Sequence, residues 1–210
     1  MTKRKPHKDE AITGIENVEK YFETHENKAN THFGKFLNQI ENYELSGKFL
    51  EIGPGPCILT AIMLKMFPNA KFTALEISKD MIDLAKKYLE GKGYNNKVHF
   101  IEGNVYDEKL MKSLGKFDFV YSTYSLHHWQ DPVNAFRIIY NSVLADKGLL
   151  VIHDLRRVNL LYHLPIHNGI FNSIRAAYTP KEIKTMFNDI GIRNYTINTP
   201  FPFMTVFIKI

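Results

Sequence analysis

The sequence has a single cysteine and no long apolar run. With Cys57 alone, the chain can form neither an internal disulfide nor a cysteine-based zinc site, which fits a reducing compartment. No apolar run approaches the roughly 18 residues of a membrane-spanning helix, and no apolar segment follows the charged start MTKRKPHKDE. We therefore expect a soluble, cytoplasmic protein without membrane insertion.

The totals describe an ordinary globular chain with a slight basic excess. Its 210 residues are 44% hydrophobic and 23% charged, enough for one domain with its own core. The net charge is +5, and part of the excess is in the first eight residues, at Lys3, Arg4, Lys5 and Lys8. A short basic tail of this kind is typically disordered, and we expect no nucleic-acid partner for it.

Short apolar segments alternate with helix-like segments from residue 48 onward. Because each parallel crossover must return over the sheet, this alternation predicts a mostly parallel sheet with helices on both faces, an α/β/α sandwich. The expected strands are 48–52, 71–77, 97–103, 117–123 and 148–155, and the expected helices are 58–67, 79–90, 107–114 and 132–145.

Both ends of the chain depart from this alternation. Residues 15–45 have apolar side chains at helical spacing and predict two amphipathic helices. Residues 156–178 predict an interrupted helical insert, and a later helix ends at Gly191. Segments 195–201 and 203–210 predict an antiparallel C-terminal hairpin, which brings the sheet to seven strands.

These segments suggest a division of the chain. We expect residues 1–45 to form an N-terminal tail and helical lid, and residues 46–210 to form the main domain. Within that domain, residues 156–178 are expected to be a second lid or substrate insert. Tyr21 and Phe22 are expected to pack in the core, and the alternative is that they close over a cationic ligand.

A glycine turn joins the first strand to the first helix of the sheet. In the stretch EIGPGPCILT, Gly53 and Gly55 let a ligand approach the backbone, and the helix start offers N–H groups to an anion. Glu76 ends the second strand, 21 residues after Gly55, where a carboxylate can accept hydrogen bonds from ribose hydroxyls. The pattern predicts a nucleotide-like ligand.

The turn favours S-adenosylmethionine over a dinucleotide. A dinucleotide fingerprint would place its third small residue at Ile58, which is bulky. Pro54 and Pro56 also remove two backbone N–H donors, a serious loss for a pyrophosphate and a small one for a ligand whose anion is a carboxylate. Cys57 replaces a third glycine, and we interpret it as a small buried residue rather than a reactive thiol.

From these residues onward the chain resembles the class I S-adenosylmethionine-dependent methyltransferases of the quinone-biosynthesis-like branch. The similar motifs are EIGPGPC, ALEISKDMIDLAKK, FIEGNVYD, FDFVYSTYSLHHWQDP, LADKGLLVIHDLRR and YTPKEIKTMFNDIGI, in that order. The resemblance implies a Rossmann-like doubly wound fold and a cofactor that leaves as S-adenosylhomocysteine. The cofactor-binding residues it implies are Glu51, Gly53, Gly55, Glu76, Ile77, Met81, Asn104, Val105 and Ser122.

Methyl transfer from a sulfonium needs little dedicated chemistry, so catalytic residues are harder to predict. We expect an in-line displacement with nucleophile and methyl about 3–3.5 Å apart, and a general base where the acceptor is protonated. The candidates at the carboxyl ends of strands four and five are His128, His153 and Asp154, with Tyr124 and His127 nearby.

Histidines in the insert raise the question of a metal. His163 and His167 lie four residues apart and with His153 could hold an ion, but Pro165 interrupts the helix that this spacing needs. We therefore predict no metal site and a polar wall of the substrate pocket.

The sequence predicts a methyltransferase acting on a small molecule, as a monomer or homodimer. Three alternatives remain open: an RNA or protein acceptor, a nicotinamide-dependent oxidoreductase, and a non-catalytic nucleoside-binding regulator. Neither the acceptor nor its reacting atom follows from the sequence.

Overall fold

The sheet of the computed structural model has the strand order β3-β2-β1-β4-β5-β7-β6. The structure describes residues 2–7, 12–26, 29–166 and 168–210. Strands β1 to β5 pair in parallel, and β7 lies antiparallel between β5 and β6. The strands are β1 (Lys48–Ile52), β2 (Lys71–Glu76), β3 (Val98–Glu102), β4 (Phe117–Thr123), β5 (Leu144–Leu155), β6 (Tyr195–Asn198) and β7 (Phe203–Lys209).

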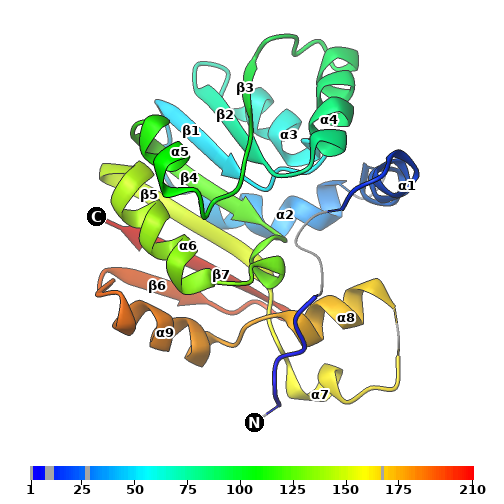
Figure 1. Ribbon diagram of the computed structural model, residues 1–210, viewed down its shortest axis with the longest axis vertical. Coiled ribbons are helices and arrows are strands. Elements are labelled where there is room, and N and C mark those ends of the chain that lie inside the picture. The colour runs from blue at the N-terminus through cyan, green and yellow to red at the C-terminus, as the bar shows by residue number, and fades with distance from the viewer. Residues whose placement is uncertain (1, 8–11, 27–28, 167) are drawn as a thin grey trace.

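The chain order of these strands creates a switch point in the middle of the sheet. The chain starts at β1, moves outward to β2 and β3, and then crosses to β4 on the other side of β1 (Figure 1). In open sheets of this kind, ligands bind outside the carboxyl ends of the strands beside the switch point. The turn after β1 therefore occupies the expected position for a ligand.

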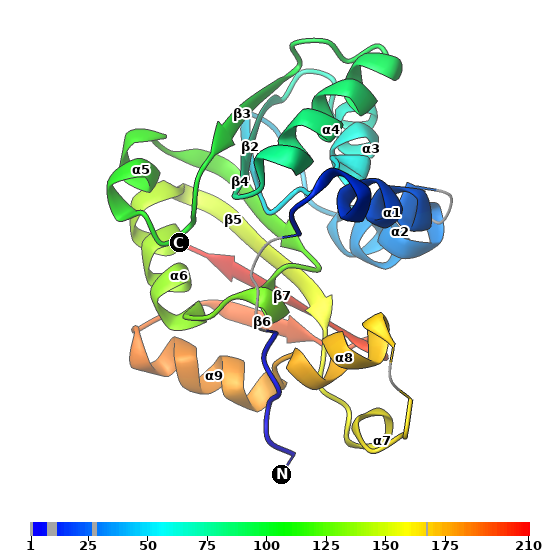
Figure 2. The same ribbon diagram turned by 45° about the vertical axis from the view of Figure 1, so that its right-hand side comes forward.

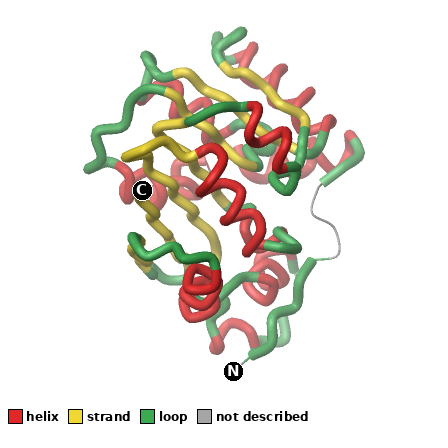
Figure 3. The backbone as a smooth tube through the Cα atoms, turned by 60° about the vertical axis from the view of Figure 1, so that its left-hand side comes forward, coloured by secondary structure: helices red, strands yellow, loops and turns green. Residues whose placement is uncertain are grey.

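Helices cover both faces of the sheet, as Figure 3 shows. They are α1 (Ile15–Glu26), α2 (Ala29–Ile40), α3 (Ile58–Met66), α4 (Lys79–Gly91), α5 (Glu108–Ser113), the 3₁₀ turn η1 (Leu126–His128), α6 (Pro132–Ile138), the π turn η2 (Ile139–Val143), α7 (Asn159–Tyr162), α8 (Gly169–Ala176) and α9 (Pro180–Asp189).

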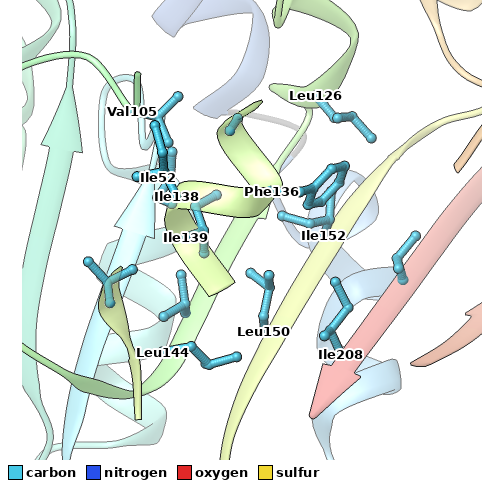
Figure 4. Close-up of a cluster of buried hydrophobic side chains, with 14 of the residues drawn as sticks. Ile52, Val105, Leu126, Phe136, Ile138, Ile139, Leu144, Leu150, Ile152 and Ile208 are labelled. Atoms are coloured by element: carbon cyan, nitrogen blue, oxygen red, sulfur yellow. The ribbon is translucent and has the colours of Figure 1, made fainter. Parts of the chain in front are cut away.

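Two main apolar clusters fill the spaces between the helices and the sheet. Helices α5, α6 and α9 pack on one face, where Phe136 lies against β5 and β7 side chains such as Ile152 (Figure 4). Helices α2, α3 and α4 pack on the other face, around Phe49 and Phe119. Strands buried on both faces need apolar side chains on both, which is why the central run Phe119-Val120-Tyr121 of β4 is apolar and fully buried.

Several helices begin at a side-chain cap that the sequence specifies. Ser78, Asp107, Asp131 and Asn168 each accept a hydrogen bond from an N–H of the first turn of α4, α5, α6 and α8. Helix α9 begins with a full capping box between Thr179 and Glu182, with Pro180 at its first position. These local signals explain why the helices expected there begin close to their predicted starts.

The expected helix 132–145 is shorter in the structure. Helix α6 ends at Ile138, a π turn follows, and β5 already begins at Leu144, which pairs with Phe117. The register then shifts, because Phe119 pairs with Leu149. Lys147 takes a left-handed φ of 66° in this irregular stretch, a conformation the apolar pattern does not reveal.

The expectation of a disordered N-terminal tail is wrong for residues 2–7. Arg4 donates from Nη2 to the carbonyl of His127 at 2.8 Å and from Nε to that of Ala176 at 2.5 Å, and its guanidinium lies 4.2 Å from the Tyr178 ring centroid. The amide of Lys5 donates to the carbonyl of Arg175. Lys8, the other basic residue of the tail, lies outside the described residues.

The predicted fold class is confirmed: an α/β/α sandwich with a doubly wound, mostly parallel seven-stranded sheet and an antiparallel C-terminal hairpin. In the part of the chain that the structure describes, no helix has both the length and the apolar composition needed to cross a lipid bilayer.

Candidate active site

The turn after β1 alternates left-handed residues with prolines. Gly53, Gly55 and Cys57 have φ values of 67°, 55° and 60°, and Pro54 and Pro56 separate them. Cys57 therefore adopts a conformation that glycine takes without strain, which is the physical reason a third glycine suits this position. Its side chain is fully buried, and burial raises the pKa of the thiol, so the interpretation as a small buried residue is confirmed.

The turn has no backbone N–H to spare for a pyrophosphate. Gly53 donates to the carbonyl of Leu75 at 2.9 Å and Cys57 to that of Pro54 at 3.2 Å. Gly55 donates to Oε2 of Glu76 at 3.0 Å, and the two prolines have no N–H. A dinucleotide loop depends on such donors within the turn, so this turn suits a pyrophosphate poorly.

Glu76 is fixed beside this turn at the end of β2. Its Oε2 accepts from Gly55 and its Oε1 accepts from the amide of Ser78 at 3.0 Å. Burial raises the pKa of the Glu76 carboxyl, and these backbone N–H groups act in the opposite direction. The carboxylate is held in one orientation and still lines an open cleft.

The cleft lies at the carboxyl ends of β1 to β4. Its walls come from the four segments that follow these strands, and its empty volume is about 1070 Å³ with the solvent at its mouth included. Tyr21 and His25 of α1 and Phe33 of α2 line it as well, and Figure 2 shows these helices beside the strand ends. None of its described lining residues belongs to the insert 156–178 or is a lysine or arginine.

Seven of the nine predicted cofactor-binding residues come together here. Gly53, Gly55, Glu76, Ile77, Met81, Asn104 and Val105 all line the cleft. Glu51 and Ser122 do not: Ser122 is fully buried, and its hydroxyl donates to the carbonyl of Ile52 at 2.7 Å. Asn104 uses Oδ1 to accept from the amide of Tyr106 at 3.0 Å, which fixes the turn after β3.

Glu51 points away from the cleft, between α3 and β4. Its Oε2 accepts from the hydroxyls of Thr60 at 2.6 Å and Tyr121 at 2.9 Å. Burial raises the pKa of Glu51 to about 7, because desolvation outweighs these two hydrogen bonds. The residue is a buried structural acid in this conformation.

Replacing Glu51 by glutamine is expected to stabilise the protein at pH 8 and to change little at pH 5. A carboxyl whose pKa rises from its usual 4.5 to about 7 on folding contributes stability at low pH that is lost between these values. Glutamine keeps an oxygen acceptor and does not ionise. We expect a melting temperature roughly 2–4 °C higher than wild type at pH 8 for each kcal/mol gained.

Calorimetry of wild type and variant at both pH values tests this expectation. Glu102→Gln, the same substitution at an exposed carboxylate on β3, serves as the control. An equal gain at pH 5 and pH 8 would show that ionisation of Glu51 is not the cause.

The predicted catalytic residues separate into one that reaches the cleft and two that do not. His128 lines the cleft, whereas His153 and Asp154 lie behind it. The ring of His153 is fully buried, and its Nδ1 is 2.8 Å from Oγ1 of Thr205. Desolvation lowers the pKa of His153 to about 4, so it is neutral at neutral pH.

Asp154 is engaged with His127, a contact that sequence reasoning missed. Its Oδ2 accepts from the backbone N–H of His127 at 2.8 Å, and its Oδ1 lies 2.7 Å from Nδ1 of the ring. Both residues are nearly fully buried. The sequence predicts that the ends of the neighbouring strands β4 and β5 lie close together. It does not predict which side chains bond to one another there.

Of the insert histidines His163 and His167, the structure describes only the first. His163 caps the end of the one-turn helix α7, with its ring 5.1 Å from that of Tyr162, and His167 lies outside the described residues. Phe22 packs against Tyr88 in the core, as expected for an amphipathic helix, while Tyr21 reaches the cleft.

The fold and the cleft define an α/β domain that binds a nucleoside-type ligand at its switch point. Residues 50–152 match the family model described as a methyltransferase domain. The resemblance to class I S-adenosylmethionine-dependent methyltransferases is thereby confirmed.

Similar proteins include both curated relatives and solved structures. Malonyl-[acyl-carrier protein] O-methyltransferase 1 of Ilyobacter polytropus is 32% identical over 99 residues, which are 47% of this chain and 34% of that protein. The four curated relatives are matched over 24–47% of their own length.

The solved structures match more of the chain at lower identity. PigF with S-adenosylhomocysteine gives a TM-score of 0.73 at 17% identity, over 94% of this chain and 60% of PigF. The plantazolicin methyltransferase BpumL, in complex with S-adenosylhomocysteine and a monoazolic desmethyl-plantazolicin analogue, gives a TM-score of 0.70 at 14% identity. This match covers 92% of the present chain and 90% of BpumL. At these identities, the likeness establishes the fold.

Proposed function

We propose that the cleft binds S-adenosylmethionine and that the protein transfers its methyl group to a small-molecule acceptor. The observation that carries this proposal is Glu76, a carboxylate fixed by two backbone N–H groups beside a turn that has no donors for a pyrophosphate. A carboxylate in this position accepts hydrogen bonds from the two ribose hydroxyls of a nucleoside.

The residues around Glu76 suit an adenosine. Ile77, Met81 and Val105 supply apolar surface for the two faces of an adenine. Asn104 has a second lone pair on Oδ1, beyond the bond to Tyr106, that can accept from the adenine amine. The start of α3 lines the cleft, and a helix N-terminus favours a carboxylate such as that of the amino-acid end.

Part of the cleft wall is aromatic. Tyr21, Phe33 and Tyr124 line it, and aromatic faces attract a cation such as a sulfonium. The acceptor forms a bond to the methyl carbon as the carbon–sulfur bond breaks, and neutral S-adenosylhomocysteine leaves. In our proposal α1 and α2 of residues 1–45 act as the lid on the domain 46–210, and the insert 156–178 stands outside the described cleft wall.

A base is needed only where the acceptor carries a proton at the reacting atom. His128 is the one predicted catalytic residue that lines the cleft, and we propose it as that base. Asp154 then acts as a positioning residue, because its bonds to His127 fix the turn η1 that bears His128. His153 has no part in the reaction in this proposal.

The lining of the cleft favours a small acceptor over RNA. RNA binding relies on Lys and Arg contacts to phosphates, and the described lining has neither. A protein-bound acceptor is the second candidate, since a relative is named for a malonyl group on an acyl carrier protein. Two alternatives come from other classes of protein. A nicotinamide-dependent oxidoreductase is disfavoured because Ile58, buried at the start of α3, stands where a dinucleotide fingerprint has a small residue. A non-catalytic nucleoside-binding regulator would share the cofactor site.

Calorimetric titration and a labelling assay test the proposal together. We expect micromolar binding of S-adenosylhomocysteine and no binding of NAD, since the turn offers a dinucleotide no N–H donors. With methyl-labelled S-adenosylmethionine and a fractionated cell extract, we expect label in the small-molecule fraction.

Each other outcome selects a different function. Binding of NAD without S-adenosylhomocysteine would identify an oxidoreductase. Label confined to precipitable RNA or protein would reject the small-molecule acceptor but keep the methyltransferase. Cofactor binding with no transfer to any fraction would leave the nucleoside-binding regulator.

A further inference from the structure

The N-terminal segment brings a third histidine to the His127-His128 pair. Residues 2–7 cross α8 and η1, and the segment is held by Arg4, by the amide of Lys5, and by Gln130, whose Nε2 donates to the carbonyl of His7 at 3.2 Å. The ring of His7 lies 4.6 Å from that of His128 and 5.5 Å from that of His127, measured between centroids. Nothing in the sequence pattern links residue 7 to residues 127 and 128.

The three imidazoles are close enough to share one ligand. One ring nitrogen from each of His7, His127 and His128 lies within 4.8 Å of the other two. Among the described residues, this is the one group of three or more histidine, cysteine or acidic side chains arranged in this way. His127 is buried, and His7 and His128 are half-buried, so an ion there would be largely shielded from solvent.

Asp154 gives His127 the arrangement typical of a metal ligand. The carboxylate lies 2.7 Å from Nδ1 of His127, so the ring is held through Nδ1, and Nε2 is the nitrogen left to bind an ion. Metal-bound histidines usually donate their other ring N–H to a carboxylate or carbonyl, which fixes the ring and raises its basicity. The second bond, from the backbone N–H of His127 to Asp154, makes this anchor rigid.

We propose that His7, His127 and His128 form a binding site for a divalent transition-metal ion, with Zn²⁺ as the best-matched ion. Three neutral imidazoles are an established ligand set for Zn²⁺, with Zn–N distances of about 2.0–2.1 Å and a fourth position left for water or substrate. In that geometry the ligand nitrogens lie about 3.4 Å apart. Side-chain rotations that move each ring nitrogen by about 1 Å would bring the three imidazoles to these distances. His128 also lines the cleft, so the site adjoins the cleft wall.

The site would join the N-terminal segment to the wall of the cleft. An ion bound by His7 and η1 links residues 2–7 to the turn that Asp154 already fixes. The guanidinium of Arg4 adds positive charge close by, since it bonds the carbonyl of His127. We therefore expect micromolar rather than nanomolar affinity. An ion on His128 would occupy the ring lone pair that a general base needs, so the base role of His128 belongs to the metal-free protein. The inference itself concerns metal binding and does not depend on the proposed methyl transfer.

Titration of tag-free, chelator-stripped full-length protein with Co²⁺ tests the site. We expect one equivalent of Co²⁺ to bind with the visible absorption of a low-coordinate site, and Zn²⁺ to displace it because Zn²⁺ binds such sites more tightly. His7→Ala is expected to weaken Co²⁺ binding at least about 10-fold. Asp154→Asn is expected to weaken it about 10- to 100-fold, because the carboxylate that holds Nδ1 of His127 is lost. His99→Ala, at an exposed histidine on β3, is the matched control and should leave affinity within twofold.

His7→Ala alters the N-terminal segment rather than the core, so it decides the result if Asp154→Asn fails to fold. Absence of Co²⁺ and Zn²⁺ binding below about 100 μM in wild type would overturn the proposal and leave a cluster of three imidazoles without a metal. Unchanged binding in His7→Ala would overturn it as well, since the ion would then be held elsewhere.

Discussion

Glu76→Ala is expected to weaken the binding of S-adenosylhomocysteine at least about 100-fold, because two hydrogen bonds to a charged group contribute about 1.5–3 kcal/mol each. The alanine also releases the amides of Gly55 and Ser78, which the carboxylate now holds at 3.0 Å, so the turn loses its orientation as well. Calorimetric titration at pH 7.5 measures the change in affinity.

Two controls separate the ribose contact from a general loss of structure. Glu102→Ala removes an exposed carboxylate from the position on β3 that pairs with Glu76, and it should bind the ligand like wild type. Glu76→Gln keeps an oxygen near the two amides, so we expect an intermediate loss of affinity. Unchanged affinity in a folded Glu76→Ala protein would show that the ribose assignment is wrong.

Gly53→Ala is expected to destabilise the protein and to abolish measurable cofactor binding. Gly53 has a φ of 67°, where a side chain costs about 1–2 kcal/mol. A Cβ there would also lie 2.6 Å from Oγ of Ser125 and 3.2 Å from its Cβ. Ser125 precedes η1 and accepts from Nε1 of Trp129, so the clash moves the wall of the cleft that bears His128.

A second glycine isolates the backbone strain from the clash. Gly115 has a φ of 77° and open space where a Cβ would be added. Gly115→Ala should therefore cost only about 1–2 kcal/mol of unfolding free energy and leave cofactor affinity unchanged. Adding Ser125→Gly to Gly53→Ala removes both clashing atoms and is expected to restore part of the binding. Equal loss of binding in Gly115→Ala and Gly53→Ala would contradict the role assigned to Ser125.

The predicted cofactor residues show where sequence patterns are reliable. Gly53, Gly55 and Glu76 lie at strand ends, and parallel strands bring their carboxyl ends to one edge, so their convergence follows from the strand order. Glu51 and Ser122 also lie at strand ends, but their side chains bond Thr60, Tyr121 and the carbonyl of Ile52 instead. The sequence places a residue at the edge of the sheet, and the packing of neighbours decides where its side chain points.

The histidines show the opposite case. Spacing drew attention to His163 and His167, whose helix Pro165 interrupts, while the group that the structure assembles joins His7 to His127 and His128. A contact across more than a hundred residues has no local signature, because it depends on how the N-terminal segment packs on α8 and η1.

The sequence by itself determined the seven-stranded sheet, its helices and the position of the cleft, through the alternation of apolar segments, the capping residues and the glycine turn. Each of these features depends on interactions within a few residues or on the fixed hand of parallel crossovers. The tertiary structure alone decided that Asp154 holds His127, that Glu51 is a buried acid and that residues 2–7 close against η1. These contacts join side chains far apart in the chain, and their partners are chosen by burial and charge in three dimensions.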